Sequence, residues 1–124
     1  MLLIRTLQYY SMLFNIVPVP KPRQTQADRW KKRPCVMRYR AFADECRAKG
    51  VEIVNGSTVI FYLPMPKSWS KKKKALMLGK GHQQKPDVDN LLKAVMDATM
   101  KDDSHIYDIH SQKYWSEKGG IQIL

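Results

Sequence analysis

Two aspartates lie two residues apart in the stretch KPDVDN, Asp87 and Asp89, directly after the most lysine-rich part of the chain. Asp102 and Asp103 follow downstream, and Lys93 lies between the two acidic pairs. Carboxylate oxygens suit Mg²⁺, which usually completes its shell with waters and substrate phosphate oxygens. A bound metal would lower the pKa of a water molecule and stabilise charge on a reacting phosphate. These residue types therefore predict a Mg²⁺ site for phosphodiester chemistry.

The surrounding pattern predicts how these side chains are presented. In an extended segment Asp87 and Asp89 would point to the same side. Asp89 or Asn90 is a good N-cap for the amphipathic stretch that follows, so we expect Lys93 on the Asp89 face, one helical turn along. Lys93 would stabilise charge on the phosphate, and Asn90 would orient a metal-binding carboxylate. Spacing alone does not determine whether Asp103 returns to this face.

A plainer interpretation is that the aspartates only cap a helix. Lys93 would then form ordinary surface pairs with Asp89 and Asp97, each contributing about 0.2–0.5 kcal/mol. Other chemistries lack their patterns: no histidine has HxH or HExxH spacing, and LGKGH does not match a phosphate-binding P-loop. No nucleotide cofactor is expected.

The charge distribution favours a polyanionic partner. The chain carries a net charge of +11, and residues 67–85 hold seven lysines and no acid, whereas residues 87–108 hold six aspartates and two lysines. A surface that only binds DNA gains nothing from that acidic block, but a bound cation would explain it. The side chains expected to contact phosphates are Arg23, Arg29, Lys31, Lys32, Arg33, Lys67, Lys71, Lys72, Lys73, Lys74 and Lys85. Trp30 and Trp69 would either stack on bases or anchor their loops to the core.

Hydrophobic periodicity and turn residues predict the elements that position these groups. We expect strands at 12–17, 57–63, 105–115 and 121–124, helices at 34–49 and from 89 or 90 onward, and a basic connector with a short helical turn at 72–78. The order strand, helix, strand, helix, strand, strand predicts one α/β (α+β) domain, with a mixed sheet of about four strands and two main helices. The apolar runs near the start are too short for a membrane span.

The segments KPDVDNLLKAVMDA and DDSHIYD strongly resemble the RusA family of Holliday junction resolvases (crossover junction endodeoxyribonucleases), especially its phage-type members. VPVPKPRQTQADRWKKRP and MPKSWSKKKK look like the segments that those members carry upstream. The resemblance covers about residues 12–124, so we interpret residues 1–11 as an extra N-terminal segment.

This resemblance implies a Mg²⁺-dependent endonuclease, with Mn²⁺ as a substitute, that cuts four-way DNA junctions symmetrically as a homodimer. Asp87, Asp89 and Asp103 would be the essential carboxylates and metal ligands, Asp102 a less certain ligand, and Lys93 the essential lysine. The expected location is the cytoplasm of a bacterial or phage-infected cell. Two alternatives stay open: a non-catalytic basic DNA-binding module, and a metal nuclease for flaps or other branched DNA.

Overall fold

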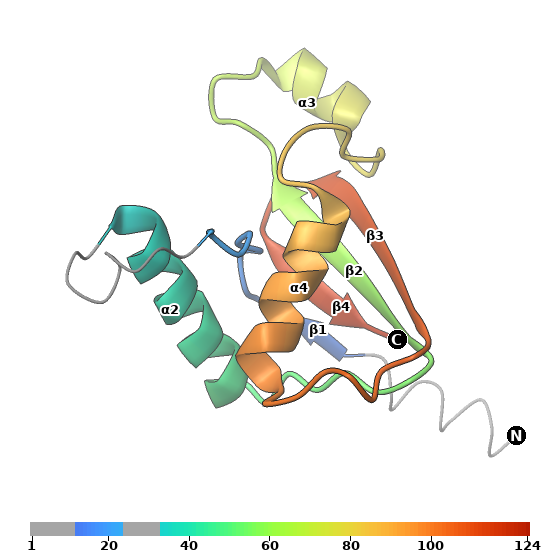
Figure 1. The fold of residues 1–124 in the computed structure, drawn as a ribbon. Coiled ribbons are helices and arrows are strands. Elements are labelled where there is room, and N and C mark those ends of the chain that lie inside the picture. The colour runs from blue at the N-terminus through green and yellow to red at the C-terminus, as the bar shows by residue number, and fades with distance from the viewer. Residues whose placement is uncertain (1–11, 24–32) are drawn as a thin grey trace, which may run out of the picture.

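The computed structural model describes residues 12–23 and 33–124, which form four strands and three helices (Figure 1). The elements in chain order are β1 (Met12–Phe14), α2 (Pro34–Ala48), β2 (Ser57–Pro64), α3 (Lys71–Met77), α4 (Val88–Thr99), β3 (Ile109–Ser116) and β4 (Gly120–Ile123). They make one α+β unit, as the order of elements predicted.

The four strands form one mixed sheet in the order β1-β4-β2-β3. β4 runs antiparallel to both β1 and β2, whereas β2 and β3 are parallel, with Ser57 opposite Ile109 and Pro64 opposite Ser116. A parallel pair needs a crossover connection. Here the crossover carries α3 and α4, so the proposed catalytic residues lie on the longest connection within the described residues.

Helices α2 and α4 cover one face of the sheet (Figure 1). α4 turns Leu91, Ala94, Val95 and Ala98 toward the core, and this spacing of three and four residues places them on one side of the helix. The burial pattern of β2 alternates strictly over Ser57–Leu63, so its core-facing residues meet the helices while Thr58, Ile60 and Tyr62 face outward.

Four local features differ from the expectations. β3 begins at Ile109 and not at residue 105, because the chain first makes a turn in which the Ile106 N–H donates to the Asp103 carbonyl (3.0 Å). β1 ends at Phe14, because the chain turns there with a hydrogen bond from the Ile16 N–H to the Phe14 carbonyl (2.9 Å). The connector forms a true helix, α3, which Ser70 caps by accepting from the Lys73 N–H (3.1 Å). α4 begins at Val88 with Asp87 as the N-cap residue, earlier than predicted.

Candidate active site

Helix α4 presents a row of charged side chains on its outer surface. Because its apolar residues face the core, Asp89, Lys93 and Asp97, spaced four residues apart, share the opposite side. Asp89 lies in the first helical turn, so the expectation of an extended Asp87–Asp89 segment is wrong, and the alternation argument does not apply. Asp87 and Asp89 are both exposed, with Asp87 on the extended residue just before the helix.

The capping interpretation does not account for Asp87. It occupies the N-cap position, yet its side chain makes no capping hydrogen bond. Asp89 accepts only a local bond from the Asn90 N–H (2.9 Å) among the contacts described for its carboxylate. At least one oxygen of each carboxylate is therefore available to a ligand from solvent.

The segment before Asp87 is held from β3. The Lys113 ammonium donates to the carbonyls of Gln84 (2.6 Å) and Pro86 (2.8 Å). The sequence suggested no role for Lys113, because its two partners, Gln84 and Pro86, lie 29 and 27 positions before it in the chain. By fixing the carbonyl directly before Asp87, Lys113 sets where the chain enters α4.

Lys93 joins α4 to the acidic pair downstream. Its ammonium lies 3.2 Å from a carboxylate oxygen of Asp103 and 3.2 Å from one of Asp97. The hydrogen bond to Asp103, followed by that to Asp97, raises the pKa of Lys93 above its ordinary value. The loop after α4 therefore returns to the charged side of this helix, which spacing had left undetermined.

Asp102 has a different environment from Asp103. Its carboxylate accepts from the Ser104 N–H (2.9 Å), and hydrogen bonds from the Ser104 side chain and then from this N–H lower the pKa of Asp102. Asp102 thus stabilises the turn that carries Asp103, whose side chain reaches Lys93.

Asp97 is a site residue that the sequence reasoning treated only as a surface partner. It binds both Lys93 and Lys21, the latter from the loop after β1. Burial alone would raise the pKa of Asp97, but the hydrogen bonds from Lys21 and Lys93 outweigh it and lower the pKa. Its position four residues after Lys93 was the available signal.

The donor set suits a hard divalent cation, although it forms no closed cage. Among the described residues, no three His, Cys, Asp or Glu side chains lie close enough together to hold a metal ion. Mg²⁺ seldom uses such a cage, because waters and substrate phosphates supply much of its octahedral shell. The exposed carboxylates of Asp87 and Asp89 therefore fit an ion that binds together with a phosphate.

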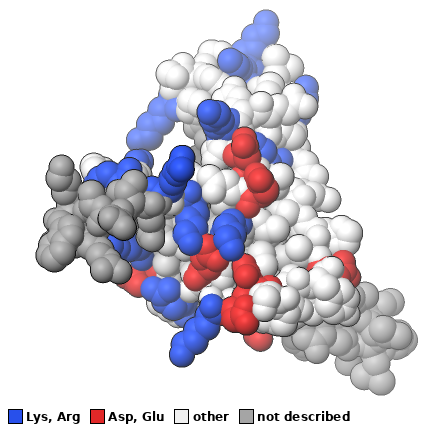
Figure 2. All heavy atoms as spheres, viewed as in Figure 1, with Lys and Arg blue, Asp and Glu red and all other residues white. Residues whose placement is uncertain are grey.

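Positive charge surrounds these carboxylates (Figure 2). Lys67, Lys71, Lys72, Lys73, Lys85 and Arg23 are exposed, and Lys74 and Arg33 are half-buried. A hollow of about 470 Å³ beside Asp87 is lined by Pro20, Lys85, Pro86, Asp87 and Asn90. Arg29, Trp30, Lys31 and Lys32, which were expected to contact DNA, lie outside the described residues.

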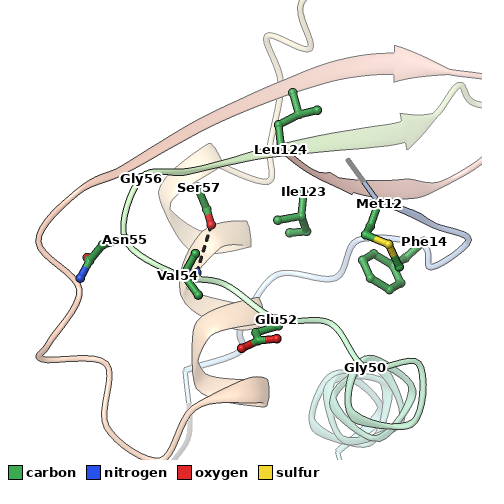
Figure 3. A pocket seen from close by; sticks show the side chains of 10 residues that line it. All are labelled: Met12, Phe14, Gly50, Glu52, Val54, Asn55, Gly56, Ser57, Ile123 and Leu124. Atoms are coloured by element: carbon green, nitrogen blue, oxygen red, sulfur yellow. Dashed lines mark hydrogen bonds between the residues drawn. The ribbon is translucent and has the colours of Figure 1, made fainter. Parts of the chain in front are cut away.

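A larger hollow of about 650 Å³ lies at the start of β2 and the end of β4 (Figure 3). The side chains of Met12, Phe14 and Ile123 point into it, and Glu52 is the one residue with an ionisable side chain among the described residues that line it. It holds none of the predicted site residues and offers no pair of acids for a metal. The predicted site residues that the structure describes lie elsewhere, several of them on α4.

The chain matches the family model described as "Endodeoxyribonuclease RusA" over residues 15–124. It is also similar to the "Uncharacterized protein YqaN" of Bacillus subtilis (strain 168), at 42% identity over 71 residues. That match covers 51% of this chain and 50% of the relative. In the described part of the chain, no helix is long and apolar enough to cross a membrane.

Proposed function

The chain belongs to the RusA endodeoxyribonuclease family, and we propose that it is a metal-dependent endonuclease that resolves four-way DNA junctions by paired phosphodiester cleavage. The observation that carries the proposal is the return of Asp103 to α4, where it meets Lys93 at 3.2 Å. Through this contact Asp103, from the downstream pair Asp102–Asp103, lies against α4, the helix that has Asp87 as its N-cap residue and Asp89 in its first turn.

In this proposal Asp87, Asp89 and Asp103 would hold a divalent cation, with Asp102 as a further candidate. Nucleases of this family generally depend on a metal ion, and Mg²⁺ is the proposed ion, with Mn²⁺ as a substitute. Such an ion supplies a Lewis acid for the phosphate and lowers the pKa of a bound water. Asp103 would exchange its contact with Lys93 for a contact with the ion.

The remaining polar groups would position the DNA. Lys93, with its side chain 55% exposed, would donate to a phosphate oxygen near the cleaved bond while Asp97 holds its ammonium group. The exposed lysines of α3 and Lys85 would bind neighbouring phosphates and fix the register of the strand. Asn90 lines the hollow beside Asp87 and would orient a carboxylate there.

A four-way junction needs two matched cuts, so a two-fold homodimer is part of the proposal. The outward face of the sheet supports it: the outward positions of its strands include Leu13, Thr58, Ile60, Tyr62, Gln112, Tyr114 and Gln122, and none of them is Lys, Arg, Asp or Glu. Two copies with a charge of +11 each can approach on such a face without placing like charges together. A DNA substrate of this kind would place the protein in the cytoplasm of a bacterial or phage-infected cell.

The test compares cleavage and binding in the wild type and in Asp89→Asn. With Mg²⁺, the wild type should convert a synthetic four-way junction into two nicked duplexes, whereas Asp89→Asn should bind the junction but cut it at least about 100-fold more slowly. Asp44→Asn is the matched control, since Asp44 is also an exposed helical aspartate paired with a basic residue, Arg47.

Three results would redirect the proposal. No cleavage by the wild type in Mg²⁺ or Mn²⁺ would favour a non-catalytic DNA-binding module. Faster cleavage of flaps than of junctions would assign the site to another branched substrate. Equal cleavage by Asp89→Asn and Asp44→Asn would remove Asp89 from the site.

A further inference from the structure

The segment from Pro66 to His82, here called the α3 arm, projects from the end of the sheet at which β2 finishes (Figure 1). Helix α3 at its centre contains no buried residue. Burial of apolar surface therefore does not hold this helix in place, unlike α4, which has four buried residues. The arm needs other contacts at its two ends.

Both ends of the arm are anchored on β3. On one side the Trp69 ring packs 4.8 Å from the ring of Trp115, which in turn lies 4.2 Å from His82. On the other side three backbone hydrogen bonds join the arm to the strand: the N–H of Gly79 and that of His82 donate to β3, and Lys80 accepts from it. The helix is thus held at its base and exposed along its length.

These anchors occupy Trp69, one of the two tryptophans that the sequence offered for base stacking. Trp69 is half-buried against Trp115, and the Lys73 ammonium lies 4.3 Å from its ring centre. This arrangement supports the anchoring alternative for Trp69. An apolar contact between the arm and a base must therefore come from other side chains.

Two leucines remain exposed on the arm. Leu76 is 59% exposed and Leu78 is 49% exposed. A single exposed leucine would need no explanation. Here two of them lie in a segment, residues 67–85, whose seven lysines and lack of acids fit a polyanion. A phosphate makes no favourable contact with a leucine side chain. Apolar side chains do, however, insert between bases where stacking is interrupted.

We infer that the α3 arm recognises the branch point of its DNA substrate, with lysines on the phosphates and Leu76 and Leu78 against the unstacked bases. The inference rests on the proposed function, since a four-way junction is a DNA in which stacking is interrupted at the centre. It assigns to the leucines the selection of branched over linear DNA.

The arm is close enough to the proposed metal site to read the same junction that is cut. Leu78 and Asp87 are nine residues apart, so they are separated by at most about 30 Å. That span corresponds to about nine base steps along one strand. The Lys113 backbone carbonyl binds the arm at His82 while its side chain binds the carbonyls before Asp87, which couples the two positions.

The experiment measures binding in EDTA, where cleavage does not interfere, with a junction that carries 2-aminopurine at the branch point and a linear duplex of matching sequence. Wild-type protein should raise the fluorescence, because the probe base loses its stacking. Leu76→Ala/Leu78→Ala should abolish most of that rise and bind the junction about tenfold more weakly, with duplex affinity changed by less than about twofold. Leu76→Met/Leu78→Met should keep both the fluorescence rise and the junction affinity of the wild type, since Met keeps an apolar side chain of similar size.

Val54→Ala is the matched control, because Val54 is 56% exposed and lies just before β2, at the end of that strand opposite the arm. The inference is overturned if the alanine pair keeps the fluorescence rise and the junction affinity, or if it loses duplex affinity equally. Cleavage is read separately with Mg²⁺. If the wild type cuts junctions and Leu76→Ala/Leu78→Ala binds them with unchanged affinity, the inference about the arm is refuted and the proposed function is not. A wild type that raises the fluorescence without ever cutting supports the inference and refutes catalysis.

Discussion

The ammonium group of Lys93 lies between two carboxylates that come from different parts of the chain. Asp97 belongs to the same helix, and Asp103 belongs to the loop that follows it. If Asp103 holds the metal ion, Asp97 would be the partner that keeps Lys93 in place. Asp97 also binds Lys21, which ties the loop after β1 to the same point. Asp97 is thus a positioning residue for Lys93.

Replacing Asp97 by Asn should lower kcat for junction cleavage by about tenfold while KM changes by less than about twofold, because Lys93 is misplaced and DNA binding is spread over many lysines. Asp97→Glu should recover part of the rate, since it restores the charge. Single-turnover and steady-state assays measure both constants. Asp44→Asn serves again as the control. An unchanged kcat in Asp97→Asn would show that Asp103 or the DNA alone positions Lys93.

The same substitution has a signature in the pH dependence of stability. The pKa of Asp97 is lowered in the folded chain, so its ion pairs stabilise the fold above the ordinary pKa of 3.8, and this contribution is lost as the pH falls through the lowered value. At pH 7 the free energy of unfolding of Asp97→Asn should be lower than that of the wild type by about 1 kcal/mol. Denaturation with urea should show this difference at pH 7 and its steady decrease as the pH falls below 3.8. A difference that stays constant from pH 7 to below 3.8 would contradict the assignment.

At the scale of elements, local patterns were sufficient where one face of an element is buried. The amphipathic pattern of α4 and the β-prone run of β2 both predicted the observed type of element. Helix α3 was recognised only as a turn, since nothing in it is buried and its limits depend on the Ser70 cap. Anchoring by Trp69 was one of the two roles considered from the sequence, but its partner could not be inferred, because Trp69 and Trp115 are 46 positions apart.

The candidate site divides in the same way. The position of Lys93 on the Asp89 side of α4 follows from their four-residue spacing in a helix, which can be read from the sequence. The Lys93–Asp103 contact depends on the path of a loop, and the Lys113 contact depends on the parallel pairing of β2 with β3. These are tertiary arrangements, and a single sequence carries no local signal for them.

The lysines of α3 give a prediction about the arm as an element. Each phosphate that a lysine neutralises contributes about 0.9 to the slope of log affinity against log salt concentration. Lys71 and Lys72 are exposed, so Lys71→Ala/Lys72→Ala should lower the magnitude of this slope by about 2, for linear and branched DNA alike. Lys73 is left intact because it lies over Trp69. Titrations at several salt concentrations give the slope.

Lys49→Ala is the control for that experiment, since Lys49 is engaged with Glu45 at the end of α2. Its slope should match that of the wild type. A loss confined to junctions in Lys71→Ala/Lys72→Ala would mean that these two lysines read DNA shape. An unchanged slope would mean that α3 does not contact phosphates, and it would also weaken the assignment of the leucines.

The described part of the molecule has two unlike sides. Basic and acidic side chains gather over α2, α4 and the loop after α4 (Figure 2). The outward face of the sheet, behind these helices, carries only neutral residues and His110 at its strand positions. With DNA on the charged side, a second copy can bind on the neutral side without competing for phosphates. This division predicts that dimer formation and DNA binding can be changed independently.

Ile60 tests that division, because it is half-buried at the centre of β2 and its side chain faces away from the core. Wild-type protein should show twice the chain mass of 14.5 kDa by light scattering, and Ile60→Lys should show the chain mass alone, since the dimer would bury two unpaired charges. On a plasmid with an extruded cruciform, the dimer should give linear product by paired cuts, and the variant should give nicked circles. Val54→Lys adds the same charge at an exposed position outside this face and should remain a dimer. A monomeric wild type would refute the dimer, and a dimeric Ile60→Lys would place the interface elsewhere.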